Sequence, residues 1–147
     1  MSYGQIIGAS VPAGFAGEIA RGEFDYTAET RVNNAAAPVA AFGVAVKLAD
    51  DGSVTPTTAA GDAVFGFSLR LFGQADLTGG QAAHEKALPV LRRGYFFAKA
   101  AGTPKAGGKV NLASNGAITA DEGTAIPNAV FSGTVDSDGL VEIAYNI

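Results

Sequence analysis

The sequence contains two copies of one short pattern, and this repeat restricts the chain to folds built from two similar β units. Residues 46–55 read VKLADDGSVT and residues 110–119 read VNLASNGAIT. A second pair of similar segments follows, DAVFG at 62–66 and NAVFS at 128–132. The distance between these two copies is slightly longer because of a short insertion. Each copy places a turn pair between apolar residues, the pattern of a β-hairpin. The repeat carries no reactive group and therefore predicts a scaffold.

Turn chemistry marks three hairpins. Asp51-Gly52, Asn115-Gly116 and Asp138-Gly139 tolerate positive φ in two-residue turns, and each pair lies between runs rich in Val, Leu, Ile and Phe. Short strands at this spacing predict an all-β fold, either a jelly-roll-like sandwich or a small barrel built from two similar hairpin units. Further strands are expected at 63–71, 87–91, 95–100, 129–135 and 140–145.

Residues 80–88 carry the strongest helical signal of the chain, and that signal is weak. They would form about two turns before Pro89 ends the helix, or a loop at the rim of the sheet. The weak propensity favours the loop.

The N-terminal stretch 1–42 differs from the remainder of the chain. It is punctuated by Gly and Pro, and its aromatic residues follow neither the period of a strand nor that of a helix. We therefore predict an extended N-terminal arm over 1–42 and a β domain over 43–147, with the internal repeat at about 43–71 and 107–135. A partly ordered tail is the alternative. Docking of the arm is favoured because exposed aromatic side chains are costly in water.

Composition excludes several classes of protein. A chain of 147 residues suits one domain with a real core. It has no Cys, so a disulfide framework and a thiolate zinc site are impossible. The formal charge of −4 argues against a nucleic-acid partner, since affinity for phosphates depends on Lys and Arg.

The chain is also poor in charge. Charged residues make up 16% of it, against about 25% in average soluble proteins. Either apolar surface is buried against other subunits, or Ala and Gly inflate the hydrophobic count. Residues 1–17 contain no Lys or Arg and are broken by glycines, so neither a signal peptide nor a membrane span is expected. We expect synthesis in the cytoplasm and no membrane partner.

Catalytic groupings are missing from the sequence. His84 is the one histidine, so a two-histidine metal motif cannot form. Residues 102–110 resemble a phosphate-binding loop, but the glycine spacing is wrong and Val110 stands where a Ser or Thr should follow the lysine. Acid pairs fall largely in hairpin turns, where Asp is favoured for local hydrogen bonding. They are Asp50-Asp51, Asp121-Glu122 and Asp136 with Asp138. We expect no catalytic, cofactor or metal site.

Arg92 and Arg93 form the one concentrated positive charge. Tyr95 and two phenylalanines follow them, a composition enriched at protein interfaces. A solvated turn is the alternative. Together with the aromatic and apolar residues of the arm, they make up the predicted partner interface: Tyr3, Ile6, Ile7, Phe15, Phe24, Tyr26, Arg92, Arg93 and Tyr95.

The order of these phrases resembles the structural cement proteins, or capsid decoration proteins, of tailed bacteriophages. The resemblance is carried by FGVAVKL at 42–48, VFGFSLR at 64–70, LPVLRRG at 88–94 and FSGTV at 131–135, and it covers roughly residues 40–147. It implies a β-rich protein on the outer surface of the virion that clamps neighbouring copies of the major capsid protein. The arm would lie on a neighbour, and a homodimer would suit a two-fold position.

Two other functions compete with this prediction. A carbohydrate-binding or ligand-binding β-sandwich module predicts exposed aromatic residues, ideally Trp, around polar groups. The chain has no Trp, and Phe outnumbers Tyr by 9 to 4 among its aromatic residues, which suits a core or an interface better. A hydrolase would need two carboxylates facing each other across a cleft.

Overall fold

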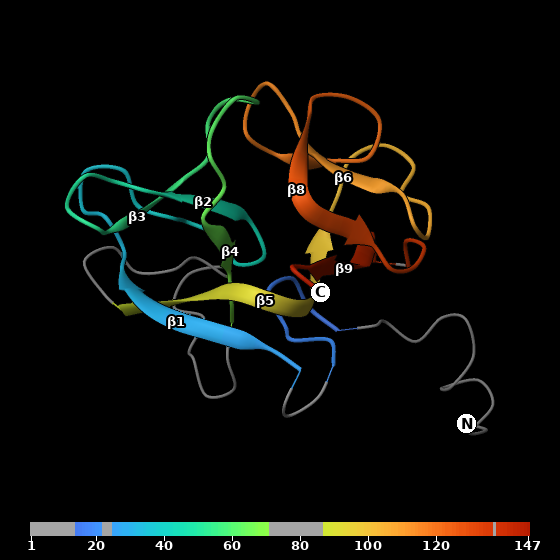
Figure 1. The fold of residues 1–147 in the computed structure, drawn as a ribbon, viewed down its shortest axis with the longest axis horizontal. Helices are drawn as coiled ribbons and strands as arrows, with labels where there is room; N and C mark the ends of the chain where they lie inside the picture. Colours follow the sequence, from blue (N-terminus) through green and yellow to red (C-terminus); the bar gives the residue numbers. More distant parts are fainter. Residues whose placement is uncertain (1–13, 22–24, 71–86, 137) are drawn as a thin grey trace.

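A computed structural model describes residues 14–21, 25–70, 87–136 and 138–147, and these residues form nine β-strands (Figure 1). These residues contain no helix, and the predicted all-β class is confirmed. The strands are β1 (Thr27–Val32), β2 (Ala45–Leu48), β3 (Val54–Pro56), β4 (Gly66–Ser68), β5 (Ala87–Lys99), β6 (Lys109–Leu112), β7 (Ile118–Thr119), β8 (Thr124–Phe131) and β9 (Leu140–Tyr145).

The strands belong to one curled antiparallel sheet. Neighbours follow the order β3-β2-β4-β5-β9-β8-β6-β7, and β1 pairs with β5 beside this path. The order is symmetric between the two halves of the chain. If β2, β3, β4 and β5 change places with β6, β7, β8 and β9, the result is the same order of strands read from β7 to β3. The two copies of the sequence pattern therefore have the same connectivity. Figure 1 shows β2, β3 and β4 on the left and β6, β8 and β9 on the right, with the long β5 passing beneath.

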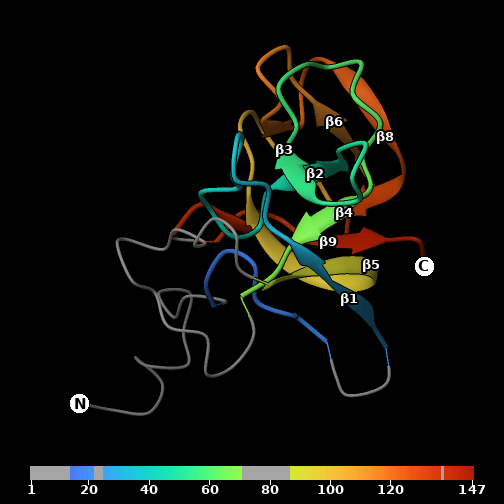
Figure 2. The ribbon, with the colours of Figure 1, turned by 90° about the vertical axis from the view of Figure 1, so that its left-hand side faces the viewer.

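Each half is closed by one parallel bridge. At the end of β1, Asn33 bridges Val54, and the Asn34 N–H donates to the Val54 carbonyl at 3.0 Å. At the end of β5, Ala101 bridges Thr119 and donates its N–H to the Ile118 carbonyl at 3.1 Å. We call β1–β4 with the first part of β5 the first ring, and β6–β9 with the second part of β5 the second ring. The rings share β5, which lies below β4 in Figure 2.

The hairpin turn of each repeat has one geometry. Ala49 donates its N–H to the Ser53 carbonyl at 2.8 Å and accepts from the Gly52 N–H at 2.9 Å, and Gly52 has φ of 83°. The second hairpin repeats both bonds at 2.8 Å, with Gly116 also at φ 83°. Only the glycine of each pair takes positive φ, so the expected two-residue turn is wrong. The turn is longer, and the glycine follows it as a bulge residue.

The expected strands at 87–91 and 95–100 are one continuous strand, β5. Pro89 is tolerated inside it because its carbonyl accepts the Leu69 N–H at 2.9 Å, while its missing N–H leaves no donor unpaired. The first part of β5 pairs with β1 and β4, and the part from Gly94 to Lys99 pairs with β9. Gly94 lies where β5 changes its partner strands. Its φ of 139° is a backbone conformation that glycine adopts readily.

The remaining strand expectations differ in accuracy. The strand at 140–145 is confirmed as β9, and the strand at 63–71 is shorter, since β4 covers only Gly66–Ser68. The strand expected at 129–135 begins earlier, at Thr124, and ends at Phe131. Residue 71 and residues 80–86 of the weak helical segment, with His84, lie outside the described residues.

The apolar side chains gather in two clusters. The larger one lines the second ring and the junction, where Phe67 stacks on Phe96 at 4.5 Å and meets Tyr145 edge-on at 5.0 Å. The smaller one lies within the first ring and consists of Val39, Phe42, Val46, Val54, Leu88 and Val90. Residues 1–42 were expected to form an extended arm. Within this stretch, residues 27–32 form β1, and Val39 and Phe42 belong to the smaller core cluster.

Candidate partner-binding surface

Five of the nine predicted interface residues lie in the described part of the chain. Arg92, Arg93 and Tyr95 lie on β5, Tyr26 directly precedes β1, and Phe15 belongs to the segment 14–21. The other four, Tyr3, Ile6, Ile7 and Phe24, lie outside the described residues.

The pairing of β1 with the middle of β5 brings Arg93 and Tyr26 close together. Arg93 pairs in register with Thr27, and an added side chain at Gly94 would meet the Tyr26 Cβ at 2.7 Å. Arg93 is exposed and its side chain makes no hydrogen bond or ion pair with the described residues, and Tyr26 is 37% exposed. The structure therefore brings these two predicted residues together on the surface.

Arg92 is already engaged within the chain. Its guanidinium lies 3.7 Å from the centre of the Phe65 ring and donates to the Phe65 carbonyl. Its Nε pairs with Glu29 at 3.3 Å, and Glu29 also meets Arg31 at 3.5 Å. Stacking of a cation on an aromatic face stabilises by about 0.5–1 kcal/mol at exposed sites. Arg92 thus joins β1 to β5 in addition to any contact it makes with a partner.

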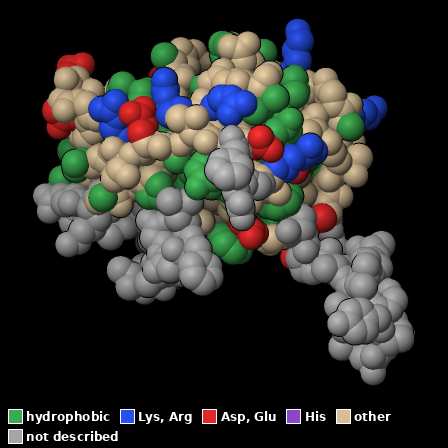
Figure 3. Space-filling view, turned by 60° about the horizontal axis from the view of Figure 1, so that its bottom comes forward, with side chains coloured by type: hydrophobic (Ala, Val, Ile, Leu, Met, Phe, Trp, Pro, Cys, Tyr) green, Lys and Arg blue, Asp and Glu red, His purple; other side chains and the backbone are tan. Residues whose placement is uncertain are grey.

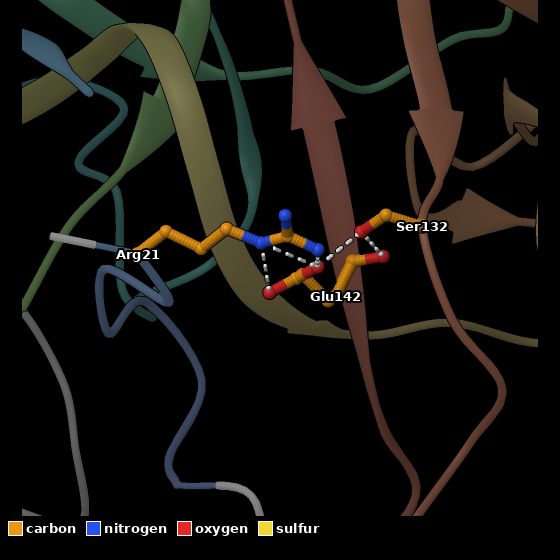
Figure 4. A network of polar contacts seen from close by, with 3 residues as sticks. All are labelled: Arg21, Ser132 and Glu142. Carbon is orange, nitrogen blue, oxygen red and sulfur yellow. Dashed lines mark hydrogen bonds and ion pairs between the residues drawn. The ribbon is translucent and has the colours of Figure 1, made fainter.

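Tyr95 is covered by Arg21, whose guanidinium lies 4.2 Å from the ring centre. Arg21 also binds Glu142 of β9 with its Nη2 at 2.7 Å, and the Ser132 hydroxyl donates to the same carboxylate at 2.6 Å (Figure 4). Burial by itself raises the pKa of Glu142, but the hydrogen bonds from Arg21 and Ser132 and the charge of Arg21 outweigh it and lower that pKa. The hydrogen bond to Glu142 raises the pKa of Arg21.

The segment 14–21 is bound to the sheet by its backbone. Gly17 donates its N–H to Phe97 at 2.8 Å, Phe97 donates to Glu18 at 3.0 Å, and Ala20 donates to Tyr95 at 2.8 Å. The Arg70 N–H also donates to the Gly17 carbonyl at 2.9 Å. Because Gly17 has φ of 85° and a Cβ there would lie 2.7 Å from that of Phe42, a larger residue does not fit. The segment joins the end of β4 to the second part of β5.

Phe15 lines a cavity of about 630 Å³ together with Lys99, Asp138 and Leu140. Its side chain is 41% exposed, and the Arg70 guanidinium lies 5.0 Å from its ring centre. Phe15 is therefore accessible to a partner while it is held in place by Arg70.

Other exposed apolar residues were not predicted from the sequence. No local sequence pattern marks them as exposed. They are Val32, Leu48, Val130, Val135 and Ile147. Leu48 belongs to the repeated pattern, and the equivalent residue of the second copy, Leu112, is buried. Figure 3 shows the face that comes forward when the lower side of Figure 1 is turned to the viewer, where basic and acidic side chains lie among apolar ones. The candidate surface thus combines basic, acidic and apolar side chains.

Two observations concern other kinds of site. Within the described ranges, no three His, Cys, Asp or Glu side chains come together in a way that would hold a metal ion. No helix in that part of the chain is long and apolar enough to cross a membrane.

Comparisons with known proteins agree on one class. The family model described as "Structural cement protein (E217 gp24/Pam3 gp6)" matches residues 3–146. A chain in the solved structure "The capsid of Myoviridae Phage XM1" is 18% identical, with a TM-score of 0.73, and the match covers 99% of this chain and 98% of that one. A search of curated proteins found no match.

Proposed function

Because the chain belongs to the phage structural cement protein family and is a component of the virion capsid, we propose that it binds the outer surface of the head and clamps neighbouring copies of the major capsid protein. The family match over residues 3–146 is the observation that carries this proposal. Proteins of this family are structural, so the chain acts through the interface it adds and not through catalysis. Many repeated copies on one shell stabilise it through avidity.

The surface carries exposed side chains of the kinds that are found in such interfaces. Phe15, Tyr26 and Arg93 are exposed, and aromatic or arginine side chains of this kind dominate binding when a partner covers them. Arg92 and Tyr95 also belong to the proposed contact set, and Phe65 and Arg21 hold their side chains in place. Tyr3, Ile6, Ile7 and Phe24 complete the proposed contact set.

We further propose that two parts of the predicted arm have different roles. The segment 14–21 anchors the arm on its own sheet through the backbone hydrogen bonds to Tyr95 and Phe97. The residues before Gly14 contact a neighbouring capsid subunit. In the same proposal the protein is a homodimer on a two-fold position, since such an interface needs one self-complementary patch. Of the two finer folds expected from the sequence, the two rings that share β5 support a small barrel built from two similar units over a jelly-roll-like sandwich.

Co-sedimentation with expanded empty capsids tests the proposal. Purified protein should pellet with the shells to saturation and raise their melting temperature. Failure to co-sediment at saturating concentration would overturn it.

Deletion of residues 1–13 tests the role of the arm. The shortened protein should keep its circular dichroism spectrum and bind capsids more weakly. A deletion of residues 1–30 is a poorer test, because it removes the hydrogen bonds of Gly17 and Ala20 and more than half of β1. Equal affinity of the protein lacking residues 1–13 would show that these residues do not contact the capsid.

A further inference from the structure

We propose that the pocket between Lys47 and Arg92 receives a segment of the capsid protein that carries one carboxylate flanked by apolar side chains. The inference rests on the proposed function and names the chemistry of one contact within it.

The pocket combines positive charge with an apolar wall. It has a volume of about 360 Å³ and is lined by Lys47, Leu48, Ala63, Val64, Phe65 and Arg92. Both charged residues that line it are cations, in a chain whose formal charge is −4. A cationic pocket on an acidic protein selects a partner of opposite charge, because complementary potentials steer the encounter and exclude partners of like charge.

The two cations have neighbours in the chain but stay accessible. The Lys47 Nζ lies 3.0 Å from Asp62 Oδ2, and this oxygen also accepts the N–H groups of Thr58 and Ala59 at 2.7 and 3.1 Å. The side chains of Lys47 and Arg92 are 31% and 38% exposed. The Asp62 and Glu29 carboxylates that pair with them do not line the pocket. Part of each cationic side chain is therefore left accessible to a partner's carboxylate.

Arg31 lies close to the same aromatic ring as Arg92. Its guanidinium lies 5.1 Å from the centre of the same Phe65 ring that Arg92 covers at 3.7 Å. Among the described side chains, the buried Nε of Arg31 has no hydrogen-bond partner. Two arginines therefore lie near Phe65, and Glu29 pairs with both of them.

Comparison of the two repeats shows that the fold does not require this pocket. Leu48 and Leu112 occupy equivalent positions, yet Leu48 is 43% exposed and Leu112 is 1% exposed. The position of Lys47 is taken by Asn111 in the second repeat. The cavity beside Leu112, about 300 Å³, is lined by no Lys or Arg. An exposed leucine beside two cations is therefore a specific feature of the first ring, and it suits a surface that a partner covers.

In the bound state the two kinds of contact act together. The partner's carboxylate accepts hydrogen bonds from the Lys47 ammonium and the Arg92 guanidinium, and its flanking apolar side chains cover Leu48 and Val64. A volume of about 360 Å³ is that of a small ligand pocket and limits the insertion to a short part of the segment. Covering the pocket also strengthens the charge pair, since it removes water from around it.

The test compares two pocket variants with a matched charge reversal elsewhere. Lys47→Glu and Leu48→Ser alter the pocket, and Lys109→Glu makes the same charge change on the exposed end of β6 in the second ring. Affinity for expanded empty capsids is measured by co-sedimentation, and circular dichroism checks that each variant is folded. We expect Lys47→Glu to weaken binding by about tenfold or more and Leu48→Ser by several-fold, while Lys109→Glu stays within about twofold.

The outcomes separate the inference from the proposed function. If the unaltered protein does not bind capsids, the proposed function fails. If it binds and Lys47→Glu binds equally well, only the inference fails. Sedimentation velocity without capsids shows whether Lys47→Glu instead disrupts self-association, a result that would assign the pocket to a second copy and overturn the inference. Acetylation of the bound protein gives a second readout, in which Lys47 should be protected and Lys109 should react as in the free protein.

Discussion

Val54 and Ile118, which occupy equivalent positions in the two copies of the repeat, hold the same place in the two rings. The Val54 carbonyl accepts the Asn34 N–H at 3.0 Å, and the Ile118 carbonyl accepts the Ala101 N–H at 3.1 Å. Both side chains are buried, at 0% and 5% exposure. The duplication thus extends beyond the hairpins to the contacts that close each ring, and β5 serves as the last strand of one unit and the first strand of the next.

The two turn glycines should differ in their tolerance of alanine. Both have φ of 83°, where a side chain costs about 1 kcal/mol or more. A Cβ at Gly116 would also lie 2.0 Å from the Thr57 carbonyl oxygen, whereas at Gly52 the nearest atom is 3.6 Å away. Gly116→Ala should therefore lower the free energy of unfolding by about 3 kcal/mol and Gly52→Ala by about 1 kcal/mol. Urea denaturation measures both, and equal losses would contradict the inter-ring contact.

Asn33 should be a strong stabilising residue of the first ring. It is fully buried, its Oδ1 accepts the Val39 N–H at 2.7 Å, and its Nδ2 donates to the Val39 carbonyl at 3.0 Å. Asn33→Ala removes both bonds and leaves buried backbone groups unpaired, so it should cost about 2–3 kcal/mol. Asn111→Ala, at a half-buried position in β6, is the control and should change stability by less than about 0.5 kcal/mol. Thermal unfolding that shows similar losses for both variants would contradict this role.

Stability should depend on pH through Glu142. Its pKa in the folded protein is lowered, so the unfolded chain binds more protons in acid. The stabilisation is present above the ordinary glutamate pKa of about 4.3 and is lost as the pH falls through the lower folded value. Glu142→Gln should therefore be less stable than the unaltered protein at pH 7, and the difference should shrink at about pH 3. Chemical denaturation at both pH values checks this, and a difference that grows in acid would contradict the sign.

Arg92 and Arg93 of β5 should differ in their contribution to the stability of the fold. Arg93→Glu should leave the melting temperature nearly unchanged, because the Arg93 side chain makes no hydrogen bond or ion pair with the described residues, and it should weaken capsid binding. Arg92→Glu should destabilise the protein by about 1 kcal/mol or more, because it removes the stacking on Phe65 and places a carboxylate beside Glu29. Melting curves and co-sedimentation of each single variant test both statements. If Arg93→Glu binds as well as the unaltered protein, Arg93 is not an interface residue.

The contrast between Leu48 and Leu112 shows where prediction from a local pattern ends. Both leucines follow a buried valine by two residues in the same hairpin pattern, and local alternation predicts the same burial for both. What covers each one comes from other strands. Leu112 pairs with β7 and β8 and belongs to the larger core cluster, while Leu48 at the end of β2 pairs only with β3 and belongs to neither cluster.

The sequence by itself determined the all-β class and the three hairpins with their glycines, and it indicated a resemblance to the cement protein family. These depend on residues close together in the chain, since turn chemistry and alternation act over a few positions. Only the tertiary structure decided that β5 runs unbroken from Ala87 to Lys99, that the segment 14–21 joins the sheet, and that Arg92 stacks on Phe65. Those contacts join residues distant in sequence, and their free energy depends on which strands meet when the whole sheet closes.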